Sequence, residues 1–237
     1  MKFKDGTGPD SLGRINVLAT DYDRTLTDLD LVLSRETISA VDRASEAGLG
    51  IIIVSGRGVQ FMLNLQNRFR HIDALVAENG AVIIHNGGID RLHEQTGAKI
   101  AMHLMEEHVP FVKGQVISYI QKGYVGEAEK AVAEMGGIAK LVRNIESGMV
   151  LPSNVDKDVG LLYALSKMGK EASGTAVVGD GENDISMFDG PFFRVAMKNS
   201  VAQLAEKAHA VTDGEGGDGV RELVSAILYS KRKSSVL

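Results

Sequence analysis

An apolar run, a helix and a second apolar run follow one another in the first quarter of the chain, and this succession limits the possible folds more than any other feature. Residues 15–18 and 50–54 both read as short buried strands. Between them, Ser34 can cap a helix that ends at Gly48. Strands joined by a helix at this spacing pair in parallel, because a parallel connection needs a long crossover. The sequence therefore predicts an α/β fold built on a parallel sheet.

The same alternation returns in the last third of the chain. An amphipathic helix that Gly169 ends is followed by an apolar strand at residues 175–178. Residues 85–153 are more polar and alternate irregularly between short helix and strand patterns, which indicates a small α+β insert with its own core. We therefore expect a doubly wound parallel-sheet core formed by residues 1–84 and 154–237, with the insert as a cap.

Two shorter segments carry further expectations. Residues 1–13 are polar and rich in glycine, and we expect a loose leader there. Asn79-Gly80 stands between the apolar runs 74–77 and 81–84. Asn-Gly in that position is the strongest short signal for a β-hairpin turn, so a hairpin is predicted at this point.

Polar side chains directly follow three of the predicted strands. In open parallel sheets, ligands bind beyond the carboxyl ends of the strands, at the point where strand order reverses. A coincidence of three polar clusters indicates a site at this edge, because unrelated surface turns would have to select acids and hydroxyls independently. The residues concerned are Asp21 and Asp23, Ser55 and Gly56, and Asp180 and Asp184.

Asp21 and Asp23 are spaced two apart at the end of the first strand, so both side chains leave it on the same side. Carboxylates this close repel by a few kcal/mol at an effective dielectric constant of ~20, and a shared proton or a bound cation relieves the repulsion. The pair suits phosphoryl transfer, in which one carboxylate attacks phosphorus and the other serves as general acid and base. An acidic turn after a strand explains the pair without any chemistry.

Asp180 and Asp184 add two carboxylates, which together with Asp21 are enough to hold Mg²⁺ and leave room for water and a phosphate oxygen. Asp184 alternatively caps a short helix over residues 185–188. Asn183 either orients the acids or only forms the turn, and it counts with Ser55, Gly56 and Lys157 among the candidate substrate-binding residues. The sequence therefore predicts a metal site whose individual members also have structural explanations.

Three residues can bind an anion. Ser55 and the amide of Gly56 stand at the entrance to a helix, where N–H groups and the helix dipole favour phosphate oxygens. Capping that helix is the alternative role for Ser55. Lys157 offers a compact positive charge to the phosphate and to a nucleophilic carboxylate, although a lysine near a helix start is ordinarily solvated. Arg57 is interpreted as structural.

The composition indicates which binding partners and which cellular compartment to expect. The net charge of −5 gives no electrostatic reason to expect nucleic acid or an anionic membrane as a partner. The absence of cysteine excludes disulfides and thiolate metal sites, and it fits a reducing compartment. No apolar run approaches the ~20 residues of a membrane span, and the first dozen residues lack an apolar signal core. We therefore expect a cytoplasmic protein.

Taken in chain order, these residues resemble the four motifs of the haloacid dehalogenase (HAD) superfamily, specifically its Mg²⁺-dependent phosphatases with a Rossmann-like core. Residues 21–27 (DYDRTLT) are similar to the first motif and residues 55–57 (SGR) to the second. Lys157 is similar to the third motif and residues 179–184 (GDGEND) to the fourth. The matched motifs span most of the chain.

The resemblance implies a role for each matched residue. Asp21 would be the nucleophile, and Asp23 would be the general acid and base that also binds metal through its backbone carbonyl. Further metal contacts are implied for Asp180 and Asp184. Phosphate contacts are implied for Ser55 and Lys157.

The long insert resembles the cap of the type IIB subgroup, and chain length and cap size are most similar to archaeal-type phosphoglycolate phosphatases. The resemblance implies hydrolysis of a small phosphorylated metabolite, with 2-phosphoglycolate as the expected substrate and Mg²⁺ as cofactor. A sugar-phosphate phosphatase, a phosphosugar mutase and a non-catalytic binding module that keeps the fold are the alternatives.

Arg24 departs from the motif of the family, since most relatives have Gly at this position. Its side chain either clashes with a φ > 0 backbone or reaches the substrate. For the oligomeric state, both a monomer and a homodimer are compatible with the sequence.

Overall fold

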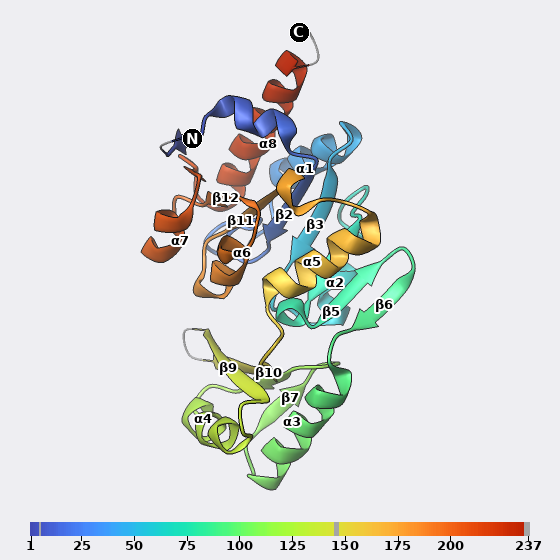
Figure 1. The fold of residues 1–237 in the computed structure, drawn as a ribbon, viewed down its shortest axis with the longest axis vertical. Coiled ribbons are helices and arrows are strands. Elements are labelled where there is room, and N and C mark those ends of the chain that lie inside the picture. Colours follow the sequence, from blue (N-terminus) through green and yellow to red (C-terminus); the bar gives the residue numbers. More distant parts are fainter. Residues whose placement is uncertain (5, 145–146, 235–237) are drawn as a thin grey trace.

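A computed structural model of the chain describes residues 1–4, 6–144 and 147–234, and it contains two sheets of unequal size (Figure 1). In the larger sheet the described residues form nine strands, with β2 near the middle. Their order across the sheet is β1 (Lys2–Phe3), β13 (Ala210–Val211), β12 (Phe193–Ala196), β11 (Thr175–Gly179), β2 (Val17–Asp21), β3 (Gly50–Val54), β4 (Ala74–Ala77), β5 (Val82–His85) and β6 (Gly88–Arg91).

The centre of the larger sheet is parallel, as the sequence predicts. β2 pairs in parallel with β3 on one side and with β11 on the other, and parallel pairing continues to β4, β12 and β13. All residues of β2, β3 and β11 are buried, which is typical of strands covered on both faces. The chain runs from β2 outward to β3 and β4 and later returns on the other side of β2 as β11. Strand order therefore reverses at β2.

Helices cover both faces of this sheet, which confirms the doubly wound arrangement. On one face the apolar core includes residues of α1 (Arg35–Glu46), α2 (Val59–Gln66) and α8 (Gly216–Ser234). On the other face it includes residues of α5 (Lys157–Met168), α6 (Ile185–Asp189) and α7 (Ala202–Lys207). None of the helices in the described part of the chain combines the length and the apolar character needed to cross a bilayer.

Local signals set the ends of several elements. The Oγ of Ser34 accepts the backbone N–H of Thr37 at 3.1 Å and so caps α1. Asn79-Gly80 forms the turn between β4 and β5, which pair antiparallel as the predicted hairpin. A Cβ on Gly80 would lie 2.0 Å from the carbonyl oxygen of Asp156. Only glycine therefore fits at the second turn position.

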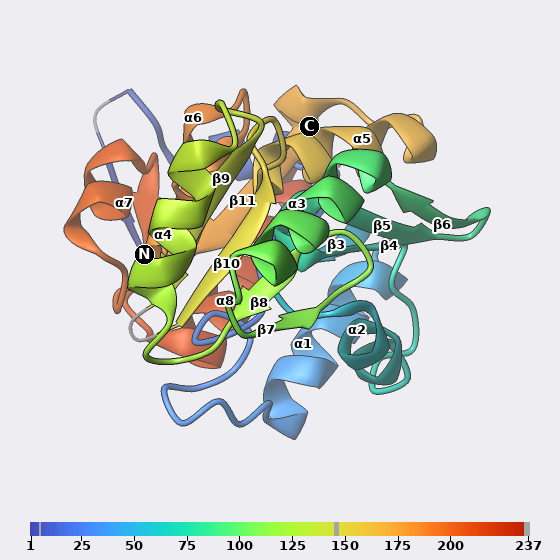
Figure 2. The same ribbon diagram turned by 90° about the horizontal axis from the view of Figure 1, so that it is seen from below.

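The smaller sheet has the strand order β7 (Phe111–Lys113), β8 (Ser118–Ile120), β10 (Ser147–Pro152) and β9 (Ala139–Asn144). Helices α3 (Glu94–Glu106) and α4 (Val125–Glu134) pack on it around a separate apolar core. We call this sheet with its two helices the cap. Figure 2 shows both helices on the outer side of the cap, so the other face of the cap sheet is turned toward the larger sheet.

Two segments differ from the expectation. The predicted cap began at residue 85, whereas β5 and β6 form a hairpin that completes the larger sheet. β6 is a partly exposed edge strand, and its polar residues therefore resemble those of the insert. The described residues of the leader, 1–4 and 6–13, are not loose, because β1 pairs with β13 and the 3₁₀ turn Pro9–Arg14 buries Leu12 in the core shared with α8.

One buried carboxylate joins the cap to the larger sheet. Glu78 directly follows β4, is 1% exposed, and accepts the backbone N–H groups of Gln115, Val116 and Ile117 at 2.7, 2.8 and 3.0 Å. These residues lead into β8 of the cap. The backbone N–H of Glu78 donates to the carbonyl of Arg57 at 3.0 Å. Glu78 thus holds a cap loop against the loop that follows β3.

Glu78→Ala is expected to lower the free energy of unfolding by about 3 kcal/mol or more, because it leaves buried N–H groups unpaired. Urea denaturation measures this difference. Glu206→Ala removes an exposed glutamate on α7 and serves as the matched control, with an expected change of less than about 0.5 kcal/mol. Equally small effects of the two substitutions would contradict the role given to Glu78.

Candidate active site

The candidate active site lies at the carboxyl ends of β2 and β11 and at the start of α5. Asp21 is the last residue of β2, Asp180 directly follows β11, and Lys157 is the first residue of α5. The Nζ of Lys157 donates to the Oδ1 atoms of Asp21 and Asp184, each at 2.6 Å. The side chains of Lys157 and Asp184 are fully buried. The fold thus gathers distant parts of the chain around one buried ammonium group.

Asp21, Asp180 and Asp184 form an acidic cluster whose ligand atoms lie within 4.8 Å of one another. Carboxylate oxygens are the donors that hard divalent cations prefer. The Oδ2 of Asp184 accepts the backbone N–H groups of Asp180 at 2.9 Å and Gly181 at 3.0 Å. Asp184 therefore also fixes the loop that presents Asp180, and the expected capping role falls on the 3₁₀ turn Glu182–Asp184 rather than on the helix after it.

Burial and mutual repulsion make this cluster costly without a counter-charge. Burial, followed by the charge of Asp184, raises the pKa of Asp21 well above its usual range. Burial is also the main cause that raises the pKa of Asp180 to about 6. For Lys157, burial lowers the pKa, but the two carboxylates outweigh it and the net shift is upward, so the ammonium stays charged. A divalent cation favours ionised carboxylates, and the residues present therefore fit a metal ion.

Asp23 stands apart from the acidic cluster and is held by Arg57. The Nε and Nη2 of Arg57 donate to the two carboxylate oxygens of Asp23, at 3.0 and 2.7 Å. Such fork-shaped pairing fixes the orientation of a carboxylate. The Asp23 side chain is 33% exposed, so it remains accessible to a ligand. The sequence interpretation gave Arg57 a structural role and missed this contact, although the parallel pairing of β2 and β3 brings their following residues to one edge.

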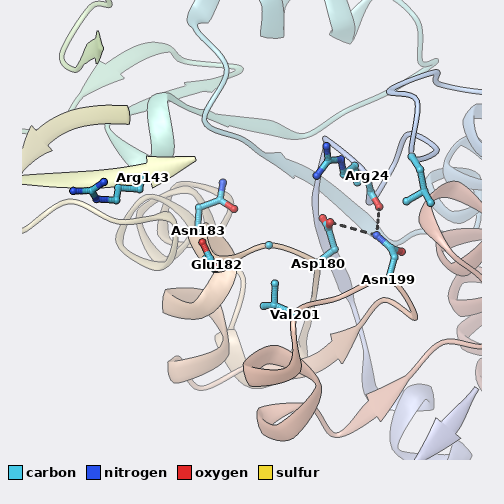
Figure 3. Close-up of a pocket in the computed structure, with 9 residues that line it drawn as sticks. Arg24, Arg143, Asp180, Glu182, Asn183, Asn199 and Val201 are labelled. Atoms are coloured by element: carbon cyan, nitrogen blue, oxygen red, sulfur yellow. Dashed lines mark hydrogen bonds between the residues drawn. The ribbon is translucent and has the colours of Figure 1, made fainter. Parts of the chain in front are cut away.

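Two further residues position Asp180. Thr25 donates from Oγ1 to Asp180 Oδ1 at 2.8 Å. The Nδ2 of Asn199 donates to Asp180 Oδ2 at 3.3 Å and to the carbonyl of Arg24 at 3.1 Å (Figure 3). Thr25 lies in the same short motif as Asp21, and this closeness in sequence could have identified it as a site residue. Asn199 follows β12, and only the strand order of the sheet identifies it.

The loop after β3 holds one amide group, the N–H of Gly56, that has no partner among the described residues. Ser55 is fully buried, its carbonyl accepts the N–H of Asn79 at 3.0 Å, and its Oγ accepts the N–H of Arg57 at 3.2 Å. The C=O and N–H of a trans peptide point in opposite directions, so the N–H of Gly56 is turned away from Asn79. No hydrogen bond from the described residues engages this N–H. The capping alternative for Ser55 is wrong, because α2 has Gly58 as its N-cap residue.

The cap also contacts this loop. Tyr119 on β8 donates its hydroxyl to the carbonyl of Gly56 at 3.0 Å. A Cβ on Gly56 would lie 3.2 Å from the sulfur of Met149 on β10. Arg143 on β9 instead pairs with Glu129 on α4 at 2.6 Å. The inner face of the cap sheet therefore reaches the candidate site through Tyr119 and Met149.

A pocket of about 510 Å³ opens beside Asp180, between the cap and the larger sheet (Figure 3). Asn183 lines it, and no hydrogen bond among the described residues joins Asn183 to the acids, so the role of orienting them has no support. The lining comprises Arg24, Leu29, Arg143, Asp180, Gly181, Glu182, Asn183, Asn199 and Val201. Most of these residues are polar or charged, which suits a polar ligand.

Comparison with known proteins places this arrangement among hydrolases. The family described as haloacid dehalogenase-like hydrolase matches residues 18–147 and 141–224. Phosphoglycolate phosphatase from Methanothermobacter thermautotrophicus is 28% identical, and the match covers 89% of this chain and 97% of that protein. Phosphoglycolate phosphatase 2 from Saccharolobus solfataricus is 31% identical, with 90% and 92% covered.

Solved structures support the fold. The crystal structure of Thermoplasma acidophilum 0175 has a TM-score of 0.76 at 21% identity, and the match covers 90% of this chain and 98% of that chain. A structure described as an HAD subclass IIB sugar phosphatase has a TM-score of 0.70 at 21% identity, with 89% and 98% covered. These likenesses establish a common fold.

Proposed function

The chain belongs to the haloacid dehalogenase-like hydrolase family, and on that basis we propose that it hydrolyses phosphate monoesters with Asp21 as the nucleophile. One observation carries the proposal: the buried Asp21 stands at the strand-order reversal, with one oxygen held by Lys157 and with two further carboxylates in reach of a shared ion. A surface turn would need neither the buried lysine nor the acidic cluster.

Mg²⁺ is the proposed cofactor. Asp21, Asp180 and Asp184 would hold it, together with the backbone carbonyl of Asp23. When bound, such an ion neutralises the crowded carboxylates and polarises the phosphate group. The raised pKa values of Asp21 and Asp180 support this assignment, since both groups gain from a nearby positive charge.

In the first step, Asp21 attacks phosphorus with the carboxylate oxygen that Lys157 does not hold. Lys157 orients the attacking carboxylate, and the N–H of Gly56 and the hydroxyl of Ser55 would donate to phosphoryl oxygens. A bond forms between Asp21 and phosphorus while the ester P–O bond breaks, which leaves an aspartyl phosphate. Asp23 gives its proton to the departing alkoxide oxygen.

In the second step, water attacks the aspartyl phosphate and its proton passes to Asp23. The bond between Asp21 and phosphorus breaks, and inorganic phosphate and a regenerated Asp21 carboxylate result. Asp23 is then protonated for the next cycle. Arg57 would keep the Asp23 carboxylate turned toward the reacting oxygen through its two hydrogen bonds.

The proposed substrate is a small phosphorylated metabolite, with 2-phosphoglycolate as the first choice. The names of the two relatives support this choice, since both matches cover most of each chain. The proposal includes a cytoplasmic location and neither nucleic acid nor a membrane as partner, in keeping with the net charge of −5 and the absence of cysteine. A monomer and a homodimer are both compatible with it.

Phosphate release with Mg²⁺ from a panel of small esters tests the proposal. The panel contains 2-phosphoglycolate, hexose phosphates, glycerol phosphates and p-nitrophenyl phosphate, and we expect the highest kcat/KM for 2-phosphoglycolate. Isomerised sugar phosphate without phosphate release would identify a mutase instead. Failure to hydrolyse any ester would leave a non-catalytic binding module as the better account.

Mg²⁺ is expected to raise the melting temperature more at about pH 7.5 than at about pH 5. The pKa of Asp180 is about 6 in the folded protein, against a usual value of 3.8. Without an ion, the protein therefore loses stability as pH rises between these values and stays less stable above them. At the higher pH, Mg²⁺ meets ionised carboxylates, whereas at the lower pH it competes with protons.

Thermal denaturation with Mg²⁺ and with a chelator, at both pH values, measures this difference. Asp180→Asn is expected to lose most of the shift that Mg²⁺ causes, and the exposed Asp30→Asn is expected to keep it. Equal shifts at the two pH values would show that the cluster does not take up the ion.

A further inference from the structure

Arg24 adopts a backbone conformation that its residue type disfavours. Its φ is 60°, in the left-handed region that glycine enters without cost and arginine rarely adopts. The N–H of Arg24 donates to Thr27 Oγ1 at 2.7 Å, and its carbonyl accepts from Asn199 at 3.1 Å. The surrounding structure thus fixes this conformation on both sides. Residues in such strained conformations cluster at active sites, and Arg24 lies next to the candidate site.

Among the described residues at this site, Arg24 carries a positive charge that no ion pair takes up, although its charge acts on nearby Asp180. Lys157 is held by two carboxylates, Arg57 by Asp23, and Arg143 by Glu129. The guanidinium of Arg24 has no ion pair or hydrogen bond within the described residues, and the residue is exposed. Figure 3 shows its side chain above Asp180, at the edge of the pocket that it helps to line.

We propose that Arg24 binds a carboxylate on the leaving group, so that the substrates are phosphate monoesters of small hydroxy acids. This inference rests on the proposed function. Arg24 lines the pocket beside Asp180, one of the carboxylates proposed to hold the ion next to the phosphate, and a group of the ester that extends into this pocket meets its guanidinium. A guanidinium pairs with a carboxylate through two parallel hydrogen bonds.

A carboxylate fits this side of the pocket better than a second phosphate does. One free guanidinium balances one carboxylate charge, whereas a phosphate dianion calls for a second cation. The other lining arginine, Arg143, is engaged by Glu129 and points away from Asp180 in Figure 3. Asp180 and Glu182 add negative charges to the lining, and these repel a dianion more strongly than a monoanion. The free charge at the pocket is therefore matched to a monoanion.

Two esters that differ only in the group under question test the inference. 2-Phosphoglycolate carries a carboxylate where 2-hydroxyethyl phosphate carries a CH₂OH group. We expect Arg24→Gln and Arg24→Gly to lower the ratio of kcat/KM values for these esters by roughly 10- to 100-fold, mainly through KM for 2-phosphoglycolate. Arg24→Lys is expected to retain part of the ratio. Arg232→Gln removes one exposed positive charge far along the chain and is expected to keep the wild-type ratio.

The outcomes separate this inference from the function on which it rests. A wild-type enzyme without preference for 2-phosphoglycolate, or Arg24 variants that keep that preference, would overturn the role of Arg24 while hydrolysis itself stands. A wild-type protein that hydrolyses no ester of the full panel would overturn both. Arg24→Gly relieves the left-handed backbone, so its melting temperature should not fall, and a lost preference in this variant cannot be assigned to unfolding.

Discussion

Asp21→Asn is expected to lower kcat by roughly 10⁴-fold or more while the fold persists. An amide in place of the carboxylate removes the attacking oxygen, and the other groups of the site cannot supply a nucleophile at the same point. The free energy of unfolding should be unchanged or higher, because burial already raises the pKa of Asp21 and disfavours its charge. Phosphate release in the presence of Mg²⁺ measures kcat, and urea denaturation measures the free energy of unfolding.

Asp30→Asn provides the matched control, since Asp30 is an exposed acid in the loop after the same strand. Its turnover should stay within about twofold of the wild-type value, as for most surface substitutions. Turnover by Asp21→Asn near the wild-type level would show that another group attacks phosphorus, and the proposed mechanism would then be wrong.

Lys157→Met is expected to lower the free energy of unfolding by about 3–5 kcal/mol, because it leaves the buried carboxylates of Asp21 and Asp184 without their shared partner. Methionine has a similar length, so the loss reports on charge rather than on a cavity. Activity should fall by roughly 10²- to 10³-fold, since a positive group beside the phosphate is lost. Urea denaturation and phosphate release measure the two effects.

The lost stability should return in part on acidification. Asp21, whose pKa is already raised by burial, takes up a proton more readily without the ammonium group, and a neutral carboxyl needs no counter-charge. Lys167→Met changes an exposed lysine near the end of the same helix, which pairs with Asp90 at the surface. This substitution should lower the free energy of unfolding by less than about 1 kcal/mol. Similar losses for the two lysines would contradict the central role of Lys157.

The centre of the fold could be predicted from the sequence because its strands are apolar on both faces. A continuous apolar run such as residues 50–54 fits only a sheet that is covered on both sides. The edge strands of the larger sheet contain no continuous apolar run of this kind. β1 contains only Lys2 and Phe3, and its partner β13 lies at the other end of the chain. Such a pairing depends on tertiary contacts that no local pattern contains.

The same distinction holds for the site. Asp21, Asp180 and Lys157 were identifiable because each lies directly at the end of a strand or the start of a helix in the parallel core. Glu78 carried no prediction, since its contact with residues 115–117 depends on how the cap sits on the larger sheet. Tyr119 escaped specific assignment for the same reason. The acids at the strand ends could therefore be predicted from the sequence, whereas the contacts between the larger sheet and the cap could be identified only in the structure.

A rapid-quench single-turnover experiment tests the attack by Asp21 most directly, and running it in oxygen-18 water shows which bond of the intermediate breaks. Excess enzyme is mixed with 2-phosphoglycolate and Mg²⁺, and mass spectrometry follows both the released phosphate and the peptide that contains Asp21. If Asp21 forms an aspartyl phosphate that breaks at its bond to phosphorus, water supplies one oxygen to the phosphate and Asp21 stays unlabelled. Rapid quenching during the turnover should then trap a phosphoryl group on the Asp21 peptide. Phosphate released at full rate with no phosphorylated Asp21 at any time point would contradict covalent catalysis.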